Sequence, residues 1–307
     1  MAWLHEDKNT FKDAVYFTAN QNNVTPAVVE KDYFVTMILQ GLANRLPFIV
    51  FKGGTSLSKC HKVIKRFSED IDVTIDTKLS QGQMGKVKDA IKDVAKTLGL
   101  TIPNIDETRS RRSYNKYLLA YPSVTEKVSE ELYPMVILET SFAEISFPTV
   151  VLPVHSMIGD MMATEAPEMI ETFILQPFEM KVQGIDRTMI DKVFAICDYY
   201  KKGDVRRHSR HLYDIFKLLP LLSLDDHFKT LVSEVREVRA KNVNLCPSAQ
   251  PGVNVPEILA YLLDNEIYKA DYENVTARIL EEPIEYSEAI TAIRKIIVSG
   301  AFEENSF

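Results

Sequence analysis

The first 185 residues mix helical spacing of apolar residues with short strand-like runs. Helical spacing predicts helices over residues 11–21, 25–46 and 81–100, the second with Thr25 as its N-cap and Pro26 in its first turn. Apolar or alternating runs predict strands over residues 47–54, 69–76, 113–123 and 133–147, the last two as a pair. Residues 55–64 are expected to form a further helix, capped by Thr55. This order predicts a mixed α/β or α+β sheet layer. With the helical pattern that follows, we expect an α+β fold.

From about Asp186 the pattern becomes almost wholly helical. Helical spacing predicts helices over residues 186–202, 205–219, 225–242, 255–265 and 286–300, with a turn-rich stretch at 244–256. The strand-like run 178–183 is expected to belong to the sheet. We therefore expect two domains: residues 1–185 around the sheet, and a mainly helical domain at 186–307.

Composition and charge narrow the class of protein. The 307 residues are 46% hydrophobic and 26% charged, as is usual for globular proteins. No apolar run is long enough to span a membrane, and the N-terminus does not resemble a signal peptide. The three cysteines are far apart, which favours a reducing cytoplasm over a disulfide scaffold or a cysteine zinc site. A net charge of −7 argues against a generally basic nucleic-acid coat, but allows a local basic groove.

The stretch FKGGTSLSKCHKVIKRFSEDIDVTI places a glycine pair shortly before two aspartates. In an extended strand Asp70 and Asp72 point to the same side, so a cation such as Mg²⁺ would compensate their repulsion. Gly53 and Gly54 would let the backbone approach a phosphate, and Ser56 adds a hydroxyl. Each piece alone also occurs as a simple turn or a solvated charge pair. Their combination predicts a site for a nucleoside triphosphate.

These motifs carry a family resemblance. GGTSLSK followed by RFSEDIDV resembles the signature of nucleotidyltransferases with the polymerase-beta-like fold. More narrowly, the chain resembles the AbiEii/AbiGii toxins of bacterial abortive-infection and toxin–antitoxin systems. Segments Val28–Leu39, Asp186–Tyr200 and Arg207–Leu219 carry this narrower match, which is weakest over residues 82–177. The resemblance implies a polymerase-beta-like nucleotidyltransferase domain with a mixed sheet, followed by a helical domain that closes the active-site cleft.

The resemblance also implies the residues of an active site. Asp70 and Asp72 would bind Mg²⁺, with Glu139 as the best candidate for a third carboxylate, and Lys192 and Asp214 would complete the site from the helical domain. The residues expected to bind the nucleotide phosphates are Gly53, Gly54, Thr55, Ser56, Lys59 and Ser68.

Helical geometry leaves the roles of Lys192 and Asp214 open. Lys192 lies on the flank of an apolar stripe formed by Met189, Val193, Ile196 and Tyr200, and would either reach a triphosphate or snorkel to solvent. Asp214 lies opposite the expected core face of Leu212, Ile215, Phe216 and Leu219, beside Arg210 and Lys217. It would form a surface ion-pair ladder, or else orient Lys192 or accept a proton from the attacking hydroxyl.

Two basic clusters are candidates for contacts with RNA phosphates, the alternative being solvated charge. The first, Arg109–Tyr117, carries Arg109, Arg111, Arg112 and Lys116 together with two tyrosines that could stack on bases. The second, Lys201–His211, includes Arg206, Arg207 and Arg210.

The combined prediction is a cytoplasmic, Mg²⁺-dependent nucleotidyltransferase. It would use two Mg²⁺ ions to transfer a nucleoside monophosphate from an NTP to RNA, plausibly a tRNA 3′ end, with release of pyrophosphate. The resemblance also implies a cognate antitoxin. Three alternatives stay open at this point: a same-fold enzyme acting on a small-molecule or protein hydroxyl, an NTP-binding module without turnover, and a non-enzymatic interaction protein.

Overall fold

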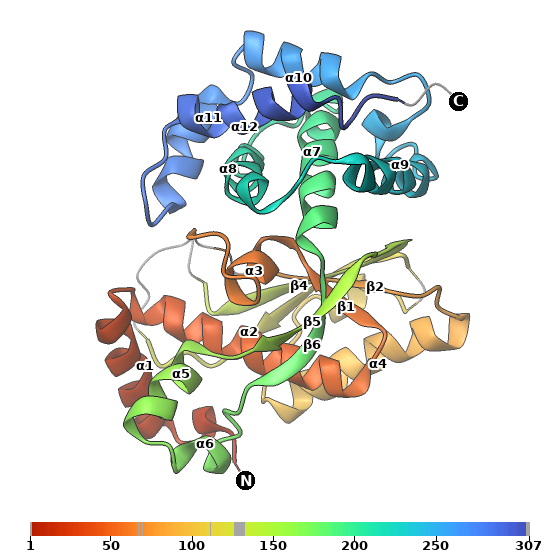
Figure 1. Ribbon diagram of the computed structural model, residues 1–307. Coiled ribbons are helices and arrows are strands. Elements are labelled where there is room, and N and C mark those ends of the chain that lie inside the picture. The colour runs from red at the N-terminus through yellow and green to blue at the C-terminus, as the bar shows by residue number, and fades with distance from the viewer. Residues whose placement is uncertain (1, 67, 69, 111, 126–132, 305–307) are drawn as a thin grey trace. The chain divides into compact units, whose positions relative to one another are not determined.

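The computed structural model describes residues 2–66, 68, 70–110, 112–125 and 133–304, which form two compact units (Figure 1). The first unit comprises Met1–Cys60, Glu69–Ile145 and Thr149–Val182. The second comprises His61–Ser68, Ser146–Pro148 and Gln183–Phe307. Two short segments from the N-terminal half of the chain therefore belong to the second unit.

A six-stranded mixed sheet forms the centre of the first unit, in the order β3-β4-β2-β1-β6-β5. β1 is antiparallel to β2 and parallel to β6, while β4 is parallel to β2 and antiparallel to β3. The expected mixed sheet is confirmed, including the pairing of the two strands β3 and β4, whereas β5 was not predicted. The strands are β1 (Ile49–Lys52), β2 (Ile71–Ile75), β3 (Tyr114–Ala120), β4 (Met135–Ile145), β5 (Thr149–Val154) and β6 (Phe178–Gln183).

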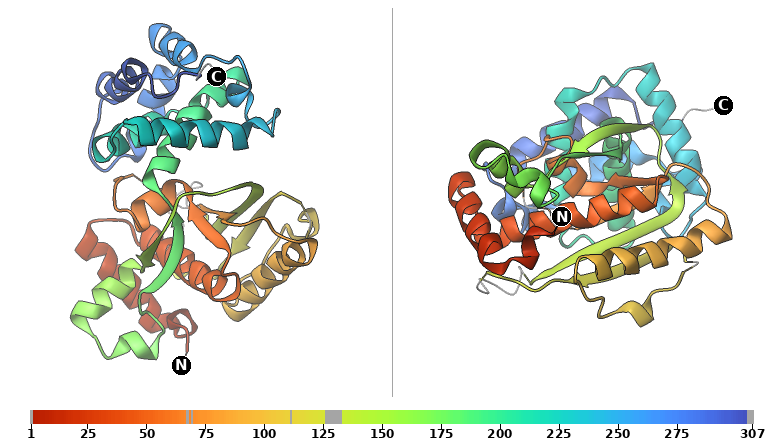
Figure 2. Two further views of the ribbon diagram at one scale, coloured as in Figure 1. Left: turned by 45° about the vertical axis from the view of Figure 1, so that its right-hand side comes forward. Right: turned by 90° about the horizontal axis from the view of Figure 1, so that it is seen from below.

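The helices of the first unit share one buried core with the sheet. They are α1 (Lys8–Asn22), α2 (Pro26–Arg45), α3 (Gly53–Lys59), α4 (Gln81–Thr97), α5 (Met157–Glu165) and α6 (Met169–Thr172). α2 contacts α1, α4, α5 and β4, which explains why it is buried on almost every side, polar residues such as Glu30 included. In Figure 2, α2 and α4 lie side by side against the sheet. Ile71 and Val73 of β2 belong to the same buried core as these helices.

The start of α3 differs from the prediction. The helix begins at Gly53, directly after β1, with Lys52 as its N-cap, so the expected cap at Thr55 is wrong. Thr55 lies inside the helix, and its hydroxyl donates to the carbonyl oxygen of Asp70 at 2.6 Å. The glycine pair is therefore the first turn of the helix, and Thr55 ties that turn to the residue before β2.

The regular structure of the second unit is helical, with turns and loops between the helices. Its helices are α7 (Ile185–Lys201), α8 (Arg210–Leu218), α9 (Asp226–Ala240), α10 (Val255–Asp264), α11 (Lys269–Asn274) and α12 (Tyr286–Ser299). α7 contacts α8, α9 and α10. The helix expected at 205–219 is shorter than predicted, because residues 205–209 form turns and Arg207 has a φ of +66°. None of the helices in the part of the chain that the structure describes is long and apolar enough to cross a membrane.

The segment His61–Ser68 is built into the second unit through its main chain. Arg66 forms an antiparallel bridge with Leu280. The main-chain N–H of Lys65 donates to the hydroxyl of Tyr213 at 3.1 Å. The path of residues 65 and 66 is therefore fixed by this unit, although the chain enters β2 only a few residues later.

Candidate active site

A row of four charged residues crosses the sheet of the first unit. The register pairs Lys52 with Asp72, Asp72 with Glu139, and Glu139 with Lys116. Directly paired residues in neighbouring strands have their side chains on the same face of the sheet. That face lies opposite the apolar core described above, because Asp72 alternates with Ile71 and Val73 along β2. Two carboxylates therefore lie side by side, flanked on each side by a strand that carries a lysine.

Because Gly53 has no side chain, the Asp72 carboxylate can occupy the space beside it. A Cβ atom added at Gly53 would lie only 2.1 Å from Oδ2 of Asp72. Gly53 also has a φ of +81°, a conformation that residues with a Cβ rarely adopt. The glycine turn and the second aspartate of the motif are thus in direct contact, and only glycine fits at this position.

The carboxylates near the glycine turn are of the ligand type that Mg²⁺ accepts. Asp70 lies immediately before β2 and is half-buried. Oε1 of Glu139 lies 3.9 Å from Nζ of Lys116. Within the described residues, no group of three or more His, Cys, Asp or Glu side chains is arranged to hold a metal. Mg²⁺ commonly takes only one or two carboxylates and completes its shell with water and substrate phosphates.

Two hydroxyls predicted to bind phosphate are engaged within the first unit. Ser56 is fully buried, and its hydroxyl donates to the carbonyl oxygen of Gly53 at 2.9 Å. Thr55 is also buried and donates to Asp70. Their hydrogen bonds stabilise the turn, so the main chain of Gly53 and Gly54 remains the part of this loop best suited to approach a phosphate.

The other two residues predicted to bind phosphate have different surroundings. Nζ of Lys59 lies 2.5 Å from Oδ1 of Asp32, and only 6% of the Lys59 side chain is exposed. Oδ2 of Asp32 also accepts the main-chain N–H of Met157 at 2.8 Å, so this ion pair connects α3 with α2 and α5. Ser68 is half-buried and belongs to the second unit.

In the second unit, Lys192 and Asp214 form a buried ion cluster with Arg66. Nε and Nη2 of Arg66 each lie 2.7 Å from one carboxylate oxygen of Asp214. Nζ of Lys192 lies 2.6 Å from Oδ2 of Asp214. The side chains of Arg66, Asp214 and Lys192 are only 3%, 0% and 6% exposed. Arg66 was not predicted, because its contact with Asp214 joins positions 148 residues apart.

The surface ion-pair ladder considered for Asp214 is wrong. The buried residues of α8 are Leu212, Tyr213, Asp214, Ile215 and Leu218, while Phe216 and Leu219 are only partly buried. Asp214 forms ion pairs with Arg66 and Lys192, which lie on the segment 61–68 and on α7. The helix is buried over a wider face than its periodicity shows, because α7, α12 and the segment containing Arg66 all contact it.

The charges within this cluster determine whether the Asp214 carboxyl is ionised. Burial alone would raise the pKa of the Asp214 carboxyl, but the cations Arg66 and Lys192 outweigh it and hold that pKa well below its ordinary value. Burial lowers the pKa of the Lys192 ammonium; Asp214 opposes this effect and Arg66 adds to it. Asp214 is therefore ionised and accepts the hydrogen bond of Lys192. A carboxylate with so low a pKa is poorly suited to take up a proton.

The first basic cluster lies on and before β3. Arg109, Arg112 and Lys116 are exposed, whereas Arg111 lies outside the described residues. Tyr114 is 49% exposed, but Tyr117 is 1% exposed, so only the first of these two tyrosines can stack on a base.

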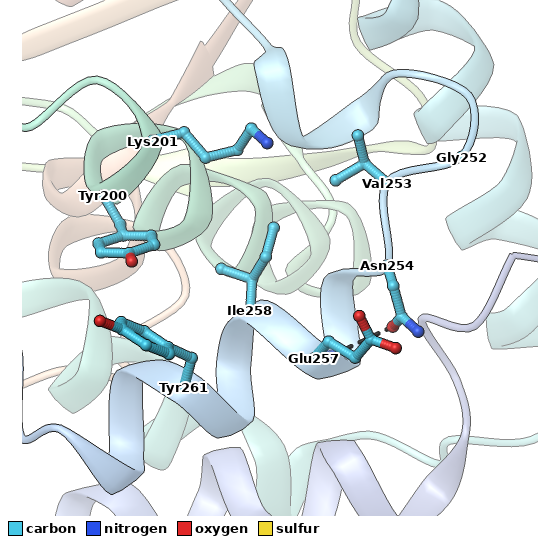
Figure 3. A pocket seen from close by; sticks show the side chains of 8 residues that line it. All are labelled: Tyr200, Lys201, Gly252, Val253, Asn254, Glu257, Ile258 and Tyr261. Atoms are coloured by element: carbon cyan, nitrogen blue, oxygen red, sulfur yellow. Dashed lines mark hydrogen bonds between the residues drawn. The ribbon is translucent and has the colours of Figure 1, made fainter.

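The second basic cluster adjoins an open pocket in the second unit. Arg206 and Arg207 are exposed and Arg210 is half-buried. Lys201 lines the pocket, which has a volume of about 360 Å³, together with Tyr200 and Tyr261 (Figure 3). The centroids of the two tyrosine rings are 5.5 Å apart. None of the residues predicted to be catalytic lines this pocket.

Comparisons with known proteins point to one class of enzyme. The sequence model of a family described as nucleotidyl transferase AbiEii toxin, type IV toxin–antitoxin system, matches residues 38–292. Among solved structures, the fold is similar to that of MenT4, a nucleotidyltransferase toxin from Mycobacterium tuberculosis H37Rv. That match has a TM-score of 0.58 and 16% identity, and covers 95% of this chain and 90% of the other. No curated protein matches the sequence.

Proposed function

The chain belongs to the AbiEii family of nucleotidyltransferase toxins of type IV toxin–antitoxin systems, and we propose that it transfers a nucleoside monophosphate from an NTP to RNA. The family establishes the class of enzyme. The observation that carries the finer proposal is the contact between Gly53 and Asp72, because it joins a turn suited to phosphates to a pair of neighbouring carboxylates.

Asp70 and Asp72 would hold Mg²⁺, with Glu139 as a third carboxylate on the neighbouring strand. When bound, one or two Mg²⁺ ions would neutralise the triphosphate and make the α-phosphate more electrophilic. The main chain at Gly53 and Gly54 would position the phosphates, since no side chain separates Gly53 from the Asp72 carboxylate. The hydroxyl of the acceptor would attack the α-phosphate, and pyrophosphate would leave.

Lys192 would stabilise the negative charge that develops on the leaving pyrophosphate. Asp214 would hold its ammonium group in place, since Oδ2 accepts from Lys192 while both carboxylate oxygens accept from Arg66. A carboxylate engaged in this way makes a poor base. Of the two roles considered for Asp214, the geometry favours the orientation of Lys192.

Exposed cations and aromatic rings favour RNA as the acceptor over a small molecule. Lys116 and Tyr114 lie exposed on β3, an edge strand of the sheet, and Lys116 follows Glu139 in the charged row. In the second unit, Lys201 lines a pocket with Tyr200 and the exposed Tyr261. Cationic side chains beside stacking platforms are typical of surfaces that bind single-stranded nucleic acid. We propose an unpaired RNA end, such as a tRNA 3′ end, as the acceptor.

The proposal includes an antitoxin partner and a cytoplasmic location. The family implies an antitoxin as partner. The three cysteines are buried, which fits the reducing cytoplasm proposed for the protein.

Sequencing the 3′ ends of cellular RNA after expression tests this function. Wild-type protein should leave untemplated nucleotides on a defined RNA class, and the variant Asp70→Ala/Asp72→Ala should leave none. Asp76→Ala is a matched control, because Asp76 directly follows β2, forms an ion pair with Lys181 and is not one of the proposed ligands. Unmodified RNA ends in growth-arrested cells would contradict the proposal for RNA. Incubating labelled NTP with total tRNA or total protein would then identify a different acceptor.

A further inference from the structure

Arg66 is a buried cation that opens the RFSEDIDV stretch, and the proposed chemistry assigns it no role. Its guanidinium donates to both oxygens of Asp214, and only 3% of its side chain is exposed. Removing two cations and a carboxylate from water costs free energy, and such clusters can often be replaced by apolar residues without loss of stability. A role in orienting the cluster gives a functional reason for an arginine at this position.

We propose that Arg66 is a positioning residue that fixes the Asp214 carboxylate and thereby aims the ammonium group of Lys192. The inference rests on the proposed function of Lys192. Two parallel N–H···O bonds between an arginine and a carboxylate fix the plane of the carboxylate as well as its distance. Oδ2 of Asp214 accepts from both Nη2 of Arg66 and Nζ of Lys192. Without Arg66 the carboxylate could rotate, and Lys192 could move with it.

Arg66 also acts on Lys192 electrostatically, as a second cation beside the pair of Lys192 and Asp214. Among the described residues, the charged and titratable groups that act on Lys192 are Asp214, Arg210 and His211 from α8, and Arg66 from the segment 61–68. Burial and the nearby cations Lys192 and Arg210 hold the pKa of His211 well below its ordinary value, so it stays neutral.

The main chain around Arg66 is held independently of the Arg66 side chain. Arg66 pairs with Leu280 through its backbone, and the backbone of Lys65 bonds to Tyr213 and Glu281. Substituting the side chain therefore leaves the anchors of this segment in place. Variants at position 66 are expected to fold, although less stably.

The test compares Arg66→Gln, Arg66→Lys and wild type in the full-length protein, by nucleotidyl transfer to total tRNA with labelled NTP. Arg66→Gln should lower kcat by about 100-fold, as is typical when a catalytic group is displaced by an ångström, with KM for RNA unchanged. Arg66 lowers the pKa of Lys192, so its removal should move the alkaline limb of the kcat–pH profile to higher pH. Arg66→Lys should return that limb towards its wild-type position, because it restores the charge, and should recover only part of kcat.

Arg236→Gln is the matched control. Arg236 is similarly buried in the same unit, and it donates to the main-chain carbonyls of Val253 and Phe302. It should lower the melting temperature while leaving the pH profile in place.

Two results overturn the inference. The first is an Arg66→Gln enzyme with wild-type kcat and pH profile, while the wild type is active and Lys192→Met is not. The second is a loss of kcat in Arg66→Gln that merely matches that of Arg236→Gln, with no shift in pH. A wild-type protein that transfers no nucleotide to any acceptor would instead refute the proposed function, and the inference would fail with it.

Discussion

A single carbon atom added at Gly53 would occupy space that the Asp72 carboxylate fills. The added Cβ would lie 2.1 Å from Oδ2, and the φ of +81° would strain any residue other than glycine. Under the proposed function, Gly53→Ala should displace Asp72 and lower kcat by about 100-fold. Steady-state nucleotidyl transfer to total tRNA measures this effect.

Gly85→Ala provides the control for this substitution. Gly85 lies inside α4, and an added Cβ would meet no atom within 4 Å. Alanine there should stabilise the protein by about 0.5–1 kcal/mol, because glycine is unfavourable inside a helix. Thermal unfolding should show a higher melting temperature with unchanged kcat. Equal losses of activity in the two variants would contradict the importance of the contact at Gly53.

Asp214 links the buried cluster to the pH dependence of stability. Its pKa in the folded protein is well below the value of about 3.9 in an unfolded chain, so its contribution is complete above that pH and declines as the pH falls. At pH 7, Asp214→Asn should lower the free energy of unfolding by about 3–5 kcal/mol, because Arg66 and Lys192 lose their counter-charge. Urea unfolding at several pH values should show the difference from wild type narrowing in acid; a constant difference would contradict this account.

At the scale of residues, the sequence indicated candidate residues but not the residues that contact them in the fold. The resemblance pointed to Lys192 and Asp214, but helical spacing placed Asp214 opposite the expected core face, where a surface ion-pair ladder and two functional roles all stayed open. Its burial depends on Arg66, which is 148 residues away along the chain. Local periodicity carries no information about such a contact, so Arg66 was missed and the surface alternative could not be excluded.

Strand β3 is the element on which the proposed RNA contact can be tested. Lys116 is exposed at the end of the charged row, and an edge strand leaves it accessible. Lys116→Gln should raise KM for RNA, reduce the salt dependence of RNA binding by about one counter-ion, and leave KM for NTP unchanged. Lys92→Gln in α4, also exposed, is the control and should change neither KM. An equal effect on the NTP would place Lys116 at the nucleotide instead.

A strand with one buried face and one polar face is easily predicted from its sequence. β2 alternates between Ile71, Val73 and Ile75 in the core and polar residues on the other face, so its pattern is clear. β5 was missed because it is an edge strand with exposed Val150 and Val151 and an internal Pro153, which resembles a loop. The start of α3 was misplaced because a glycine pair usually indicates a turn, whereas here it opens the helix.

At the scale of the whole molecule, the limits of the second unit follow the path of the chain in space, and the change in sequence pattern near residue 186 marks only one of them. The residues assigned to the second unit include two short segments from earlier in the sequence. One supplies Arg66 to Asp214. The other supplies main-chain acceptors: the carbonyl of Pro148 accepts from Gly184 at 3.0 Å, and that of Phe147 accepts from Arg187 at 3.4 Å. A division of the sequence at one position cannot reproduce this unit.

A fragment containing only residues 183–307 should therefore be much less stable than the same unit in the full chain. It would lack Arg66, which leaves Asp214 with Lys192 alone, and would lose the backbone bridge to Leu280. Because Lys192 still compensates Asp214, losing Arg66 costs less than the roughly 3–5 kcal/mol of a fully broken buried pair, but it adds to the loss of the backbone bridge in a domain of ordinary, marginal stability. Circular dichroism melting should show a broad transition at low temperature. Fusing residues 61–68 to the fragment should sharpen that transition and raise its midpoint, whereas the same fusion with Arg66→Gln should recover less. A fragment that melts as cooperatively as the full chain would show that the earlier segments do not stabilise this unit.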